Sequence, residues 1–484
     1  MKHVAFGIVL SIGWAMAQGS PLSVATHAES EPYLVDDSGH ATYPFRTGAA
    51  SPAPCTAACY RLADDAAPGE TARHGVEDAW FLVASDGTAA ALAPDALSDS
   101  AERFLVGAID ELERLYLRRE AVEWSALRVR ALAAAAGART AEATWPALAE
   151  AVASLSDHHT VFVSARSGPL QGIGVAMYPD AGGAWTIARV NDGDGAADAG
   201  LRPGDRLVAL DGMPFTGPEH ILGMPAEVDR LDLTIERPGL PEMLTVVVRR
   251  GPLTGAQPAP TGAMLGDRVG YVDLPGHLGG PVAGGGDYAA VVGELLSDQV
   301  AAGACGWMVD LRRNSGGNVL PMLAGIGPLL GDSPLGGVGA GAITRRIVYI
   351  PATRMATLPG YGSHRSPMAV ELRDPDAPVA VLLGPATASA GEWIAIMFRG
   401  RPATRSFGEP TSGLPTDRTF VGLGSDAGMW VTTGTMFDRA GRGYDEPLEP
   451  DERVATDWSR FGAVDDPVVV AAQRWLLTQA ACRN

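Results

Sequence analysis

Apolar side chains recur every three or four positions between residues 98 and 156, and this spacing predicts helices. The first helix follows Ser98, with acidic and arginine residues between its apolar positions. A second follows Trp124, and a third begins after Thr140, whose hydroxyl can cap it. We therefore expect a helical domain over residues 98–165.

After residue 170 the apolar pattern shortens to runs of five or six residues separated by Gly and Pro, which predicts strands. These runs indicate a small β domain over residues 170–252. From 264 to 476, apolar strands alternate with helical patterns, which favours an α/β core on a mostly parallel sheet. The predicted fold class is thus multidomain α/β. The core strands fall at 269–274, 307–311 and 379–383, and the helices between them at 288–296 and 392–398.

The amino-terminal part lacks a regular pattern. Residues 18–97 are rich in Ser, Pro, Gly and Ala and predict an irregular arm. Residues 1–17 combine a positive start, an apolar run and a small-x-small ending at Ala17, which indicates a signal peptide. The alternative is a buried amino-terminal helix. The run is too short to span a bilayer, and no later stretch predicts a membrane helix. We expect export to a periplasm or the medium after cleavage near Ala17.

Charge and composition narrow the function. The 484 residues include 37 basic and 56 acidic side chains, a formal charge of −19. Such a chain lacks the positive charge that holds nucleic-acid phosphates, so we expect no nucleic-acid partner. Lys2 is the only lysine, and it lies within the predicted signal peptide. The mature protein therefore has no lysine that could act as a catalytic base.

The four cysteines do not have the spacing of a zinc site. Cys55 and Cys59 are close enough for a disulfide if the turn between them is helical, whereas the pairing of Cys305 and Cys482 stays open. We expect no metal and no cofactor.

Ser389 is the candidate nucleophile. It follows a buried strand and a turn of small residues, and a helix begins directly after it. Such a turn directs a hydroxyl out of the carboxyl edge of the sheet, where α/β proteins bind ligands. The helix amino terminus adds N–H groups and positive potential for a developing oxyanion. The alternative is that Ser389 only caps the helix.

A serine nucleophile needs a base, and the candidates are His158 and His159. Both close a helix just before a strand, where a histidine can also simply complement the helix dipole. A second strand end carries Gly316 and Gly317, whose backbone N–H groups can approach a ligand closely. The alternative for this pair is an ordinary tight turn.

In this order, these segments resemble the C-terminal processing, or tail-specific, peptidase family. Residues 199–205 (Ala-Gly-Leu-Arg-Pro-Gly-Asp) resemble part of that family's PDZ domain, and residues 310–317 its glycine turn. Residues 388–392 (Ala-Ser-Ala-Gly-Glu) resemble its nucleophile motif, and residues 408–413 the segment that follows. The closing Pro-Asp lies at 450–451. The resemblance spans roughly residues 100 to 475.

One departure selects the branch of the family. The Ser–Lys branch carries its lysine after the Gly-Glu-x-Thr-x-Gly motif, where this chain has Leu414. The other branch, that of the tricorn core protease, uses Ser, His and Glu, with the histidine in an Asp-x-His-Thr-like motif. Residues 157–160 match that motif and select His159 over His158. For the glutamate we choose Glu446 over Glu449, and either is alternatively a solvated loop carboxylate.

The resemblance implies an acyl transfer in which His159 takes the proton of Ser389 and Glu446 orients the imidazolium. The backbone of Gly317 and Ala390 would form the oxyanion hole. The PDZ-like domain would capture the carboxyl terminus of a peptide or unfolded protein substrate on one loop. The alternative function is an inactive relative that binds peptides or apolar ligands, and the oligomeric state stays open. The residues of the loop are Gly172, Ile173, Gly174 and Val175.

Overall fold

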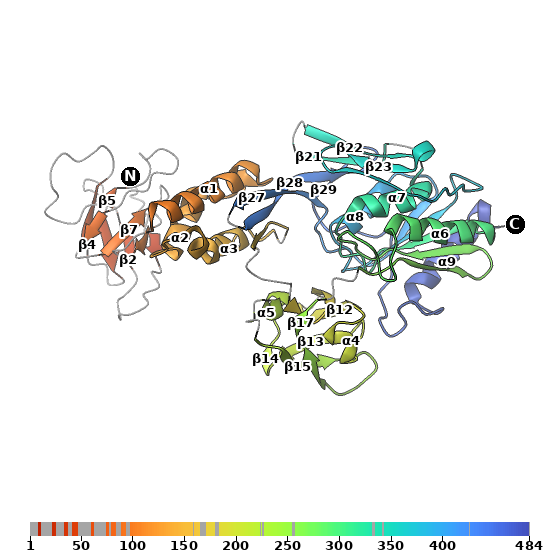
Figure 1. Cartoon of the computed structure of the whole chain (residues 1–484), viewed down its shortest axis with the longest axis horizontal. Coiled ribbons are helices and arrows are strands. Elements are labelled where there is room, and N and C mark those ends of the chain that lie inside the picture. Colours follow the sequence, from red (N-terminus) through yellow and green to blue (C-terminus); the bar gives the residue numbers. More distant parts are fainter. Residues whose placement is uncertain are drawn as a thin grey trace, which may run out of the picture. The chain divides into compact units, whose positions relative to one another are not determined.

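The computed structural model describes residues 97–157, 159–164, 171–179, 183–222, 224, 227–253, 257–331, 334–340, 343–424 and 426–483. Before residue 97 it describes only the backbone of short strands. The chain divides into two compact units (Figure 1). Unit 1 comprises residues 1–166 and 418–432, and unit 2 comprises residues 167–417 and 433–484.

Short strands before residue 97 form two sheets, with orders β1-β2-β3-β4-β5 and β6-β7-β8. The region therefore differs from the irregular arm that we expected, because strands this short leave little periodicity in the sequence. The signal peptide, its cleavage site near Ala17 and the Cys55–Cys59 pair otherwise lie outside the described residues. The strands are β1 (Ile8–Leu10), β2 (Leu22–Ala25), β3 (Tyr33–Asp36), β4 (Ala41–Arg46), β5 (Tyr60–Arg61), β6 (His74–Val76), β7 (Ala79–Val83) and β8 (Ala89–Leu92).

Three α-helices form the described core of unit 1. Ser98 caps α1 by accepting a hydrogen bond from the Ala101 N–H, and Thr140 caps the turn before α3 in the same way. The apolar face of α1 packs against the other helices and against two side chains of β28, Met429 and Val431. The elements are α1 (Asp99–Leu115), η2 (Arg119–Ala121), α2 (Trp124–Ala134), η3 (Ala141–Thr144), α3 (Trp145–Ala153) and β9 (Val161–Ser164), which pairs with β28 (Ala427–Phe437).

Residues 171–252 form a small β structure within unit 2. Its main sheet has the order β11-β12-β13-β15-β16 and is antiparallel, so β11 lies at an edge. Apolar residues of these strands form its separate core. The elements are β10 (Gln171–Gly172), β11 (Val175–Pro179), β12 (Trp185–Val190), α4 (Gly195–Asp198), β13 (Arg206–Leu210), β14 (Met213–Pro214), α5 (Pro218–Leu222), β15 (Arg230–Glu236), β16 (Leu244–Arg249) and β17 (Gly251–Pro252).

The α/β core rests on a sheet of order β18-β19-β20-β25-β26-β30, in which only the β18–β19 pair is antiparallel. This confirms the predicted mostly parallel sheet. Side chains alternate between its faces: Val309 and Val381 pack with α6, α7 and α8, whereas Met308 and Leu382 pack with α9. The elements are β18 (Thr261–Leu265), β19 (Val269–Asp273), α6 (Tyr288–Ala301), β20 (Gly306–Asp310), α7 (Val319–Leu330), β25 (Val379–Leu383), α8 (Ala390–Phe398), β26 (Thr404–Gly408), β30 (Glu452–Arg453), α9 (Pro467–Thr478) and η6 (Ala480–Cys482).

The sequence pattern did not predict a second sheet, of order β24-β23-β22-β21-β28-β27. Its strands β27 and β28 run through both units, so residues 418–432 belong to unit 1 although we expected one core over 264–476. Glycines along β21 and β28 obscure the alternation that would have revealed them. The strands are β21 (Gly336–Ala340), β22 (Ile343–Ile350), β23 (Met355–Leu358), β24 (Gly362–Arg365), β27 (Thr416–Gly424), β28 and β29 (Gly443–Tyr444), with η5 (Pro351–Thr353) before β23.

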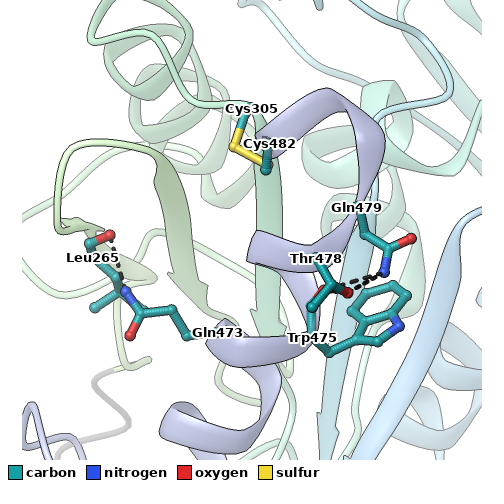
Figure 2. The surroundings of a disulfide bond; sticks show 7 residues. All are labelled: Leu265, Cys305, Gln473, Trp475, Thr478, Gln479 and Cys482. Carbon is teal, nitrogen blue, oxygen red and sulfur yellow. Dashed lines mark hydrogen bonds between the residues drawn. A yellow bond between two sulfur atoms is a disulfide. The ribbon is translucent and has the colours of Figure 1, made fainter. Parts of the chain in front are cut away.

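A disulfide joins Cys305, just before β20, to Cys482, just after α9 (Figure 2). The sequence left this pairing open, because the two cysteines are 177 positions apart. No helix in the described part of the chain is both long and apolar enough to cross a membrane.

Candidate active site

Ser389 lies on the turn between β25 and α8, at the carboxyl end of a parallel strand. Its backbone has φ +49° and ψ −118°, a conformation that non-glycine residues rarely adopt. Residues with strained backbone of this kind are concentrated at functional sites. Ser389 is also the N-cap of α8, so its hydroxyl lies where the helix dipole favours negative charge.

The Gly316–Gly317 turn lies directly against Ser389. A β-carbon on Gly316 would come within 2.7 Å of the Ser389 β-carbon, and Gly316 has φ +97°. Asn314 holds the turn: its Oδ1 accepts from the Gly316 N–H at 3.0 Å, and its carbonyl accepts from the Ala388 N–H at 2.9 Å. Among the described residues, the N–H groups of Gly317 and Ala390 have no hydrogen-bond acceptor.

Glu392 connects the serine turn to the segment that follows it. Its fully buried carboxylate accepts hydrogen bonds from four donors: the N–H of Ser389, the hydroxyl of Thr411, and the N–H groups of Gly413 and Leu414. Burial raises the pKa of Glu392 to about 7, although the hydrogen bonds act in the opposite direction. Glu392 is thus a structural link, and Leu414 occupies the position at which the other branch of the resembled family carries lysine.

The loop that carries Glu446 is fixed next to this link. The Leu448 N–H donates to the Thr411 hydroxyl at 2.8 Å, and Pro447 packs on Gly413. Glu446 is exposed and forms no hydrogen bond or ion pair within the described residues. Glu449, in contrast, forms an ion pair with Arg453 at 2.6 Å. The two candidates therefore differ, because the carboxylate of Glu449 is already in an ion pair and that of Glu446 is in none within the described residues.

His159 belongs to unit 1 and is 4% exposed. Asp157 holds the turn around it, because its carboxylate accepts from the His159 N–H, the Thr160 N–H and the Thr160 hydroxyl, at 3.0, 2.6 and 2.7 Å. Burial, and secondarily the charge of Arg418, lower the pKa of His159 to about 4. The imidazole is therefore neutral at pH 7, as a general base must be. His158 lies outside the described residues.

The loop at residues 172–175 begins the small β structure. Gly174 has φ +80° and a β-carbon there would clash with Asp194. The Ile173 carbonyl accepts from the Ala196 N–H at 2.8 Å, and the Ile173 side chain is buried. This places the loop between the edge strand β11 and the start of α4.

In unit 2 the Gly316–Gly317 turn lies against Ser389 and Ala390, and the loop of Glu446 is linked to Ser389 through Thr411 and Glu392. The structure does not bring the loop at 172–175 together with these residues. His159 belongs to unit 1. Asn314 is a site residue that the sequence reasoning missed. The signal that could have revealed Asn314 is the position of a polar residue shortly after a buried strand. In the described residues no cluster of His, Cys, Asp or Glu is suited to hold a metal ion.

The described core is a mostly parallel α/β sheet that carries Ser389 on a strained strand–helix turn. Residues 268–454 match the model of peptidase family S41, and this segment is therefore a peptidase family S41 domain. The matched segment is thus similar to serine-type peptidases.

Individual proteins are also similar to this chain. The chain is 27% identical over 161 residues to a nisin-resistance protein of Lactococcus lactis subsp. lactis, covering 33% of this chain and 49% of that protein. It thus spans about half the length of the curated relative it matches. The photosystem II D1 C-terminal processing protease has a similar fold, with a TM-score of 0.52 and 21% identity over 78% of this chain and 99% of that chain. The tricorn protease has a TM-score of only 0.39, with 13% identity over 96% of this chain and 44% of that chain.

Proposed function

We propose that this protein is an exported endopeptidase that hydrolyses peptide bonds through an acyl-enzyme on Ser389. His159 removes the hydroxyl proton as Ser389 Oγ attacks the peptide carbonyl, and then gives that proton to the leaving amine. Water, deprotonated by the same histidine, hydrolyses the ester and restores Ser389. Glu446 orients His159 and stabilises the imidazolium.

One observation carries this proposal: the strained Ser389 turn lies against the Gly316–Gly317 turn, and the N–H groups of Gly317 and Ala390 have no acceptor among the described residues. The N–H groups of Gly317 and Ala390 would hold the negative oxygen of the tetrahedral intermediate. Gly316 itself is excluded as a donor, because its N–H is bound to Asn314. Donors fixed in advance stabilise such an oxyanion at little reorganisation cost.

In the structure, the choice of Glu446 over Glu449 is supported by the interactions of the two carboxylates. Glu446 has no partner in the described residues, whereas Glu449 is bound to Arg453. The loop of Glu446 is joined through Thr411 and Glu392 to the Ser389 turn. This link supports Glu446 as the third residue of the proposed triad.

Two further features fit substrate capture and export. The edge strand β11 can accept an added peptide strand, and the loop from Gly172 to Val175 precedes it, as in PDZ-like recognition of peptide carboxyl termini. The Cys305–Cys482 disulfide is typical of proteins that fold in an oxidising compartment. A location in the envelope or outside the cell follows, in line with the predicted signal peptide.

The test is labelling with a fluorophosphonate, which reacts with activated serines. We expect the wild type to be labelled on Ser389, S389A not at all, and H159A slower on the order of 10⁴-fold or more, the scale of losing a triad member. Folding of each variant is checked by circular dichroism. A folded wild type that stays unlabelled would instead favour the alternative, an inactive relative that binds peptides or apolar ligands.

A further inference from the structure

Helix α9 is connected to both ends of β20. At the carboxyl end of β20, Asp466, the N-cap of α9, binds the guanidinium of Arg312 at 2.9 Å. At the amino end, Cys482 is joined to Cys305. Between these ties the buried face of α9 packs on the sheet, and Gln473 donates to the Leu265 carbonyl (Figure 2). The helix is therefore fixed along the strand that ends in the Gly316–Gly317 turn.

Arg312 is the residue through which Asp466 can act on that turn. Its guanidinium also binds Asp310 at 2.7 Å, and Asp310 in turn accepts from the Tyr271 hydroxyl. All three charged side chains are at most 1% exposed. Because one guanidinium faces two carboxylates, the pKa of Asp310 is lowered and that of Arg312 raised. The position of Arg312 is thus set from both sides.

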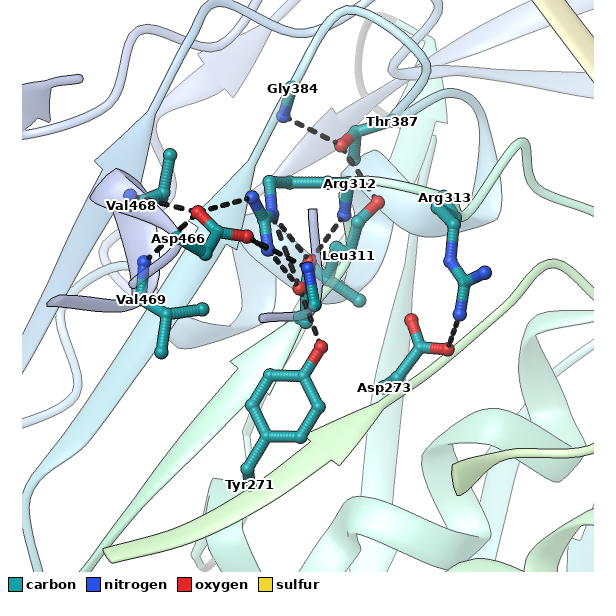
Figure 3. A network of polar contacts seen from close by, with 12 residues as sticks. Tyr271, Asp273, Leu311, Arg312, Arg313, Gly384, Thr387, Asp466, Val468 and Val469 are labelled. Carbon is teal, nitrogen blue, oxygen red and sulfur yellow. Dashed lines mark hydrogen bonds and ion pairs between the residues drawn. The ribbon is translucent and has the colours of Figure 1, made fainter. Parts of the chain in front are cut away.

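The backbone next to Arg312 contacts the serine turn. The Leu311 carbonyl accepts from the Thr387 hydroxyl at 2.9 Å, and that hydroxyl accepts from the Gly384 N–H (Figure 3). Three residues after Leu311, the Asn314 carbonyl accepts from the Ala388 N–H. A shift of Arg312 would therefore move residues 311–317 relative to Ser389.

We propose that Asp466 is a positioning residue for the oxyanion turn, and that α9, held by the Cys305–Cys482 disulfide, is part of the support of the active site. This rests on the proposed function of Ser389. Asp466 touches no substrate. It fixes Arg312, and through it the Gly317 N–H relative to the serine.

The substitution D466N isolates this effect. Asparagine is as good an N-cap as aspartate, and its Oδ1 can still accept from the Val468 N–H, which lies 3.0 Å from Asp466 Oδ1. Its Oδ1 can also still accept from Arg312 Nη1, as Asp466 Oδ1 does at 3.2 Å. Its amide NH₂, however, would face the N–H groups of Arg312 and Gly462 from which Asp466 Oδ2 now accepts hydrogen bonds. Arg312 keeps Asp310, so no buried charge is left unpaired. The matched control is A472G, which weakens the buried middle of α9 without touching Arg312.

The experiment measures the inactivation rate constant and the binding constant of a fluorophosphonate for the full chain, together with the Tm. In D466N we expect the rate constant to fall about 10- to 100-fold with an unchanged binding constant, since small displacements of catalytic groups cost on the order of 100-fold. A472G should lower the Tm and keep the wild-type rate constant. The double variant C305S/C482S should lower the rate constant less than D466N does.

Several results would overturn the inference. One is a wild-type rate constant in D466N, and another is an equal loss in D466N and A472G, which would show that α9 acts only through stability. If D466N does not fold, an unchanged rate constant in C305S/C482S contradicts the role of α9. An unlabelled wild type would reject the proposed function itself, whereas a labelled wild type with an unaffected D466N rejects only the inference.

Discussion

The nucleophile half and the histidine half of the proposed site are held in different ways. Around Ser389, two turns at the ends of parallel strands are packed backbone against backbone, and glycine is required where they meet. Around His159, a single carboxylate, that of Asp157, accepts three hydrogen bonds and sets the turn. The first half therefore depends on main-chain geometry that few side chains can alter, and the second depends mainly on one side chain.

The largest effect should separate the two candidate glutamates. We expect E446Q to lower the fluorophosphonate labelling rate on the order of 10³- to 10⁴-fold, because an uncharged amide cannot stabilise the imidazolium. E449Q removes only an exposed ion pair with Arg453 and should label like the wild type. Stopped labelling reactions, resolved by mass spectrometry, measure both rates. Equal rates in the two variants would remove Glu446 from the triad.

The next effect tests the backbone character of the nucleophile half. G316A places a methyl group 2.7 Å from the Ser389 β-carbon at a residue with φ +97°. We expect this to displace the turn that carries the Gly317 N–H, with a loss of about 10²- to 10³-fold, the scale of losing one oxyanion donor. G303A is the control, because Gly303 has φ +92° and nothing within 4 Å. It carries the same backbone strain without the crowding. Similar labelling by both variants would contradict the packing of the turns.

A smaller effect is expected in the histidine half. D157A removes all three hydrogen bonds around His159 but leaves the imidazole, so we expect the labelling rate to fall about 10- to 100-fold through misorientation. S154A is the control at the end of α3, since among the described residues the Ser154 hydroxyl bonds only the Ala151 carbonyl. If D157A labels as fast as S154A, the turn does not position His159.

The smallest effects are shifts in pH dependence. Labelling should fall in two steps on acidification, near pH 7 as Glu392 takes up a proton and near pH 4 as His159 does. T411V removes a donor that lowers the pKa of Glu392, so the upper step should move to higher pH. R418Q removes a charge that lowers the pKa of His159, so the lower step should also move up. Steps that stay in place in these variants would contradict the assignment.

The same titration of His159 has a consequence for stability. Its pKa is about 4 in the folded chain and about 6.5 as a free side chain. The unfolded chain therefore binds more protons between these values, and the folded state loses stability as the pH falls from about 6.5 towards 4. Thermal melts of the wild type and of H159A compare this loss directly.

The sequence predicted the core better than the surroundings of the site. Strand β25 was predicted at its observed bounds, because buried parallel strands are continuous apolar runs. The strand–turn–helix around Ser389 could be predicted for the same reason, and also because the turn consists of small residues. The sheet containing β21 and β28 was missed, since its residues pair across long sequence distances and include many glycines.

The supporting residues were hidden from the sequence for a related reason. Asp466 lies 154 positions from Arg312, and Cys482 lies 177 positions from Cys305. Nothing local marks Asp466 as more than a helix cap. Contacts of this kind form only when the sheet is assembled, whereas the turn of Ser389 is formed by consecutive residues.

The central claim is that His159 of unit 1 activates Ser389 of unit 2. The most direct measurement is a crystal structure of the wild type with Ser389 phosphonylated, read for the distance between His159 Nε2 and Ser389 Oγ. We predict a hydrogen-bonding distance of about 2.6–3.2 Å, as between a nucleophile and its base, with the phosphoryl oxygen on the N–H groups of Gly317 and Ala390. A different base at Ser389 Oγ, or an imidazole of His159 out of hydrogen-bonding reach, would contradict the account.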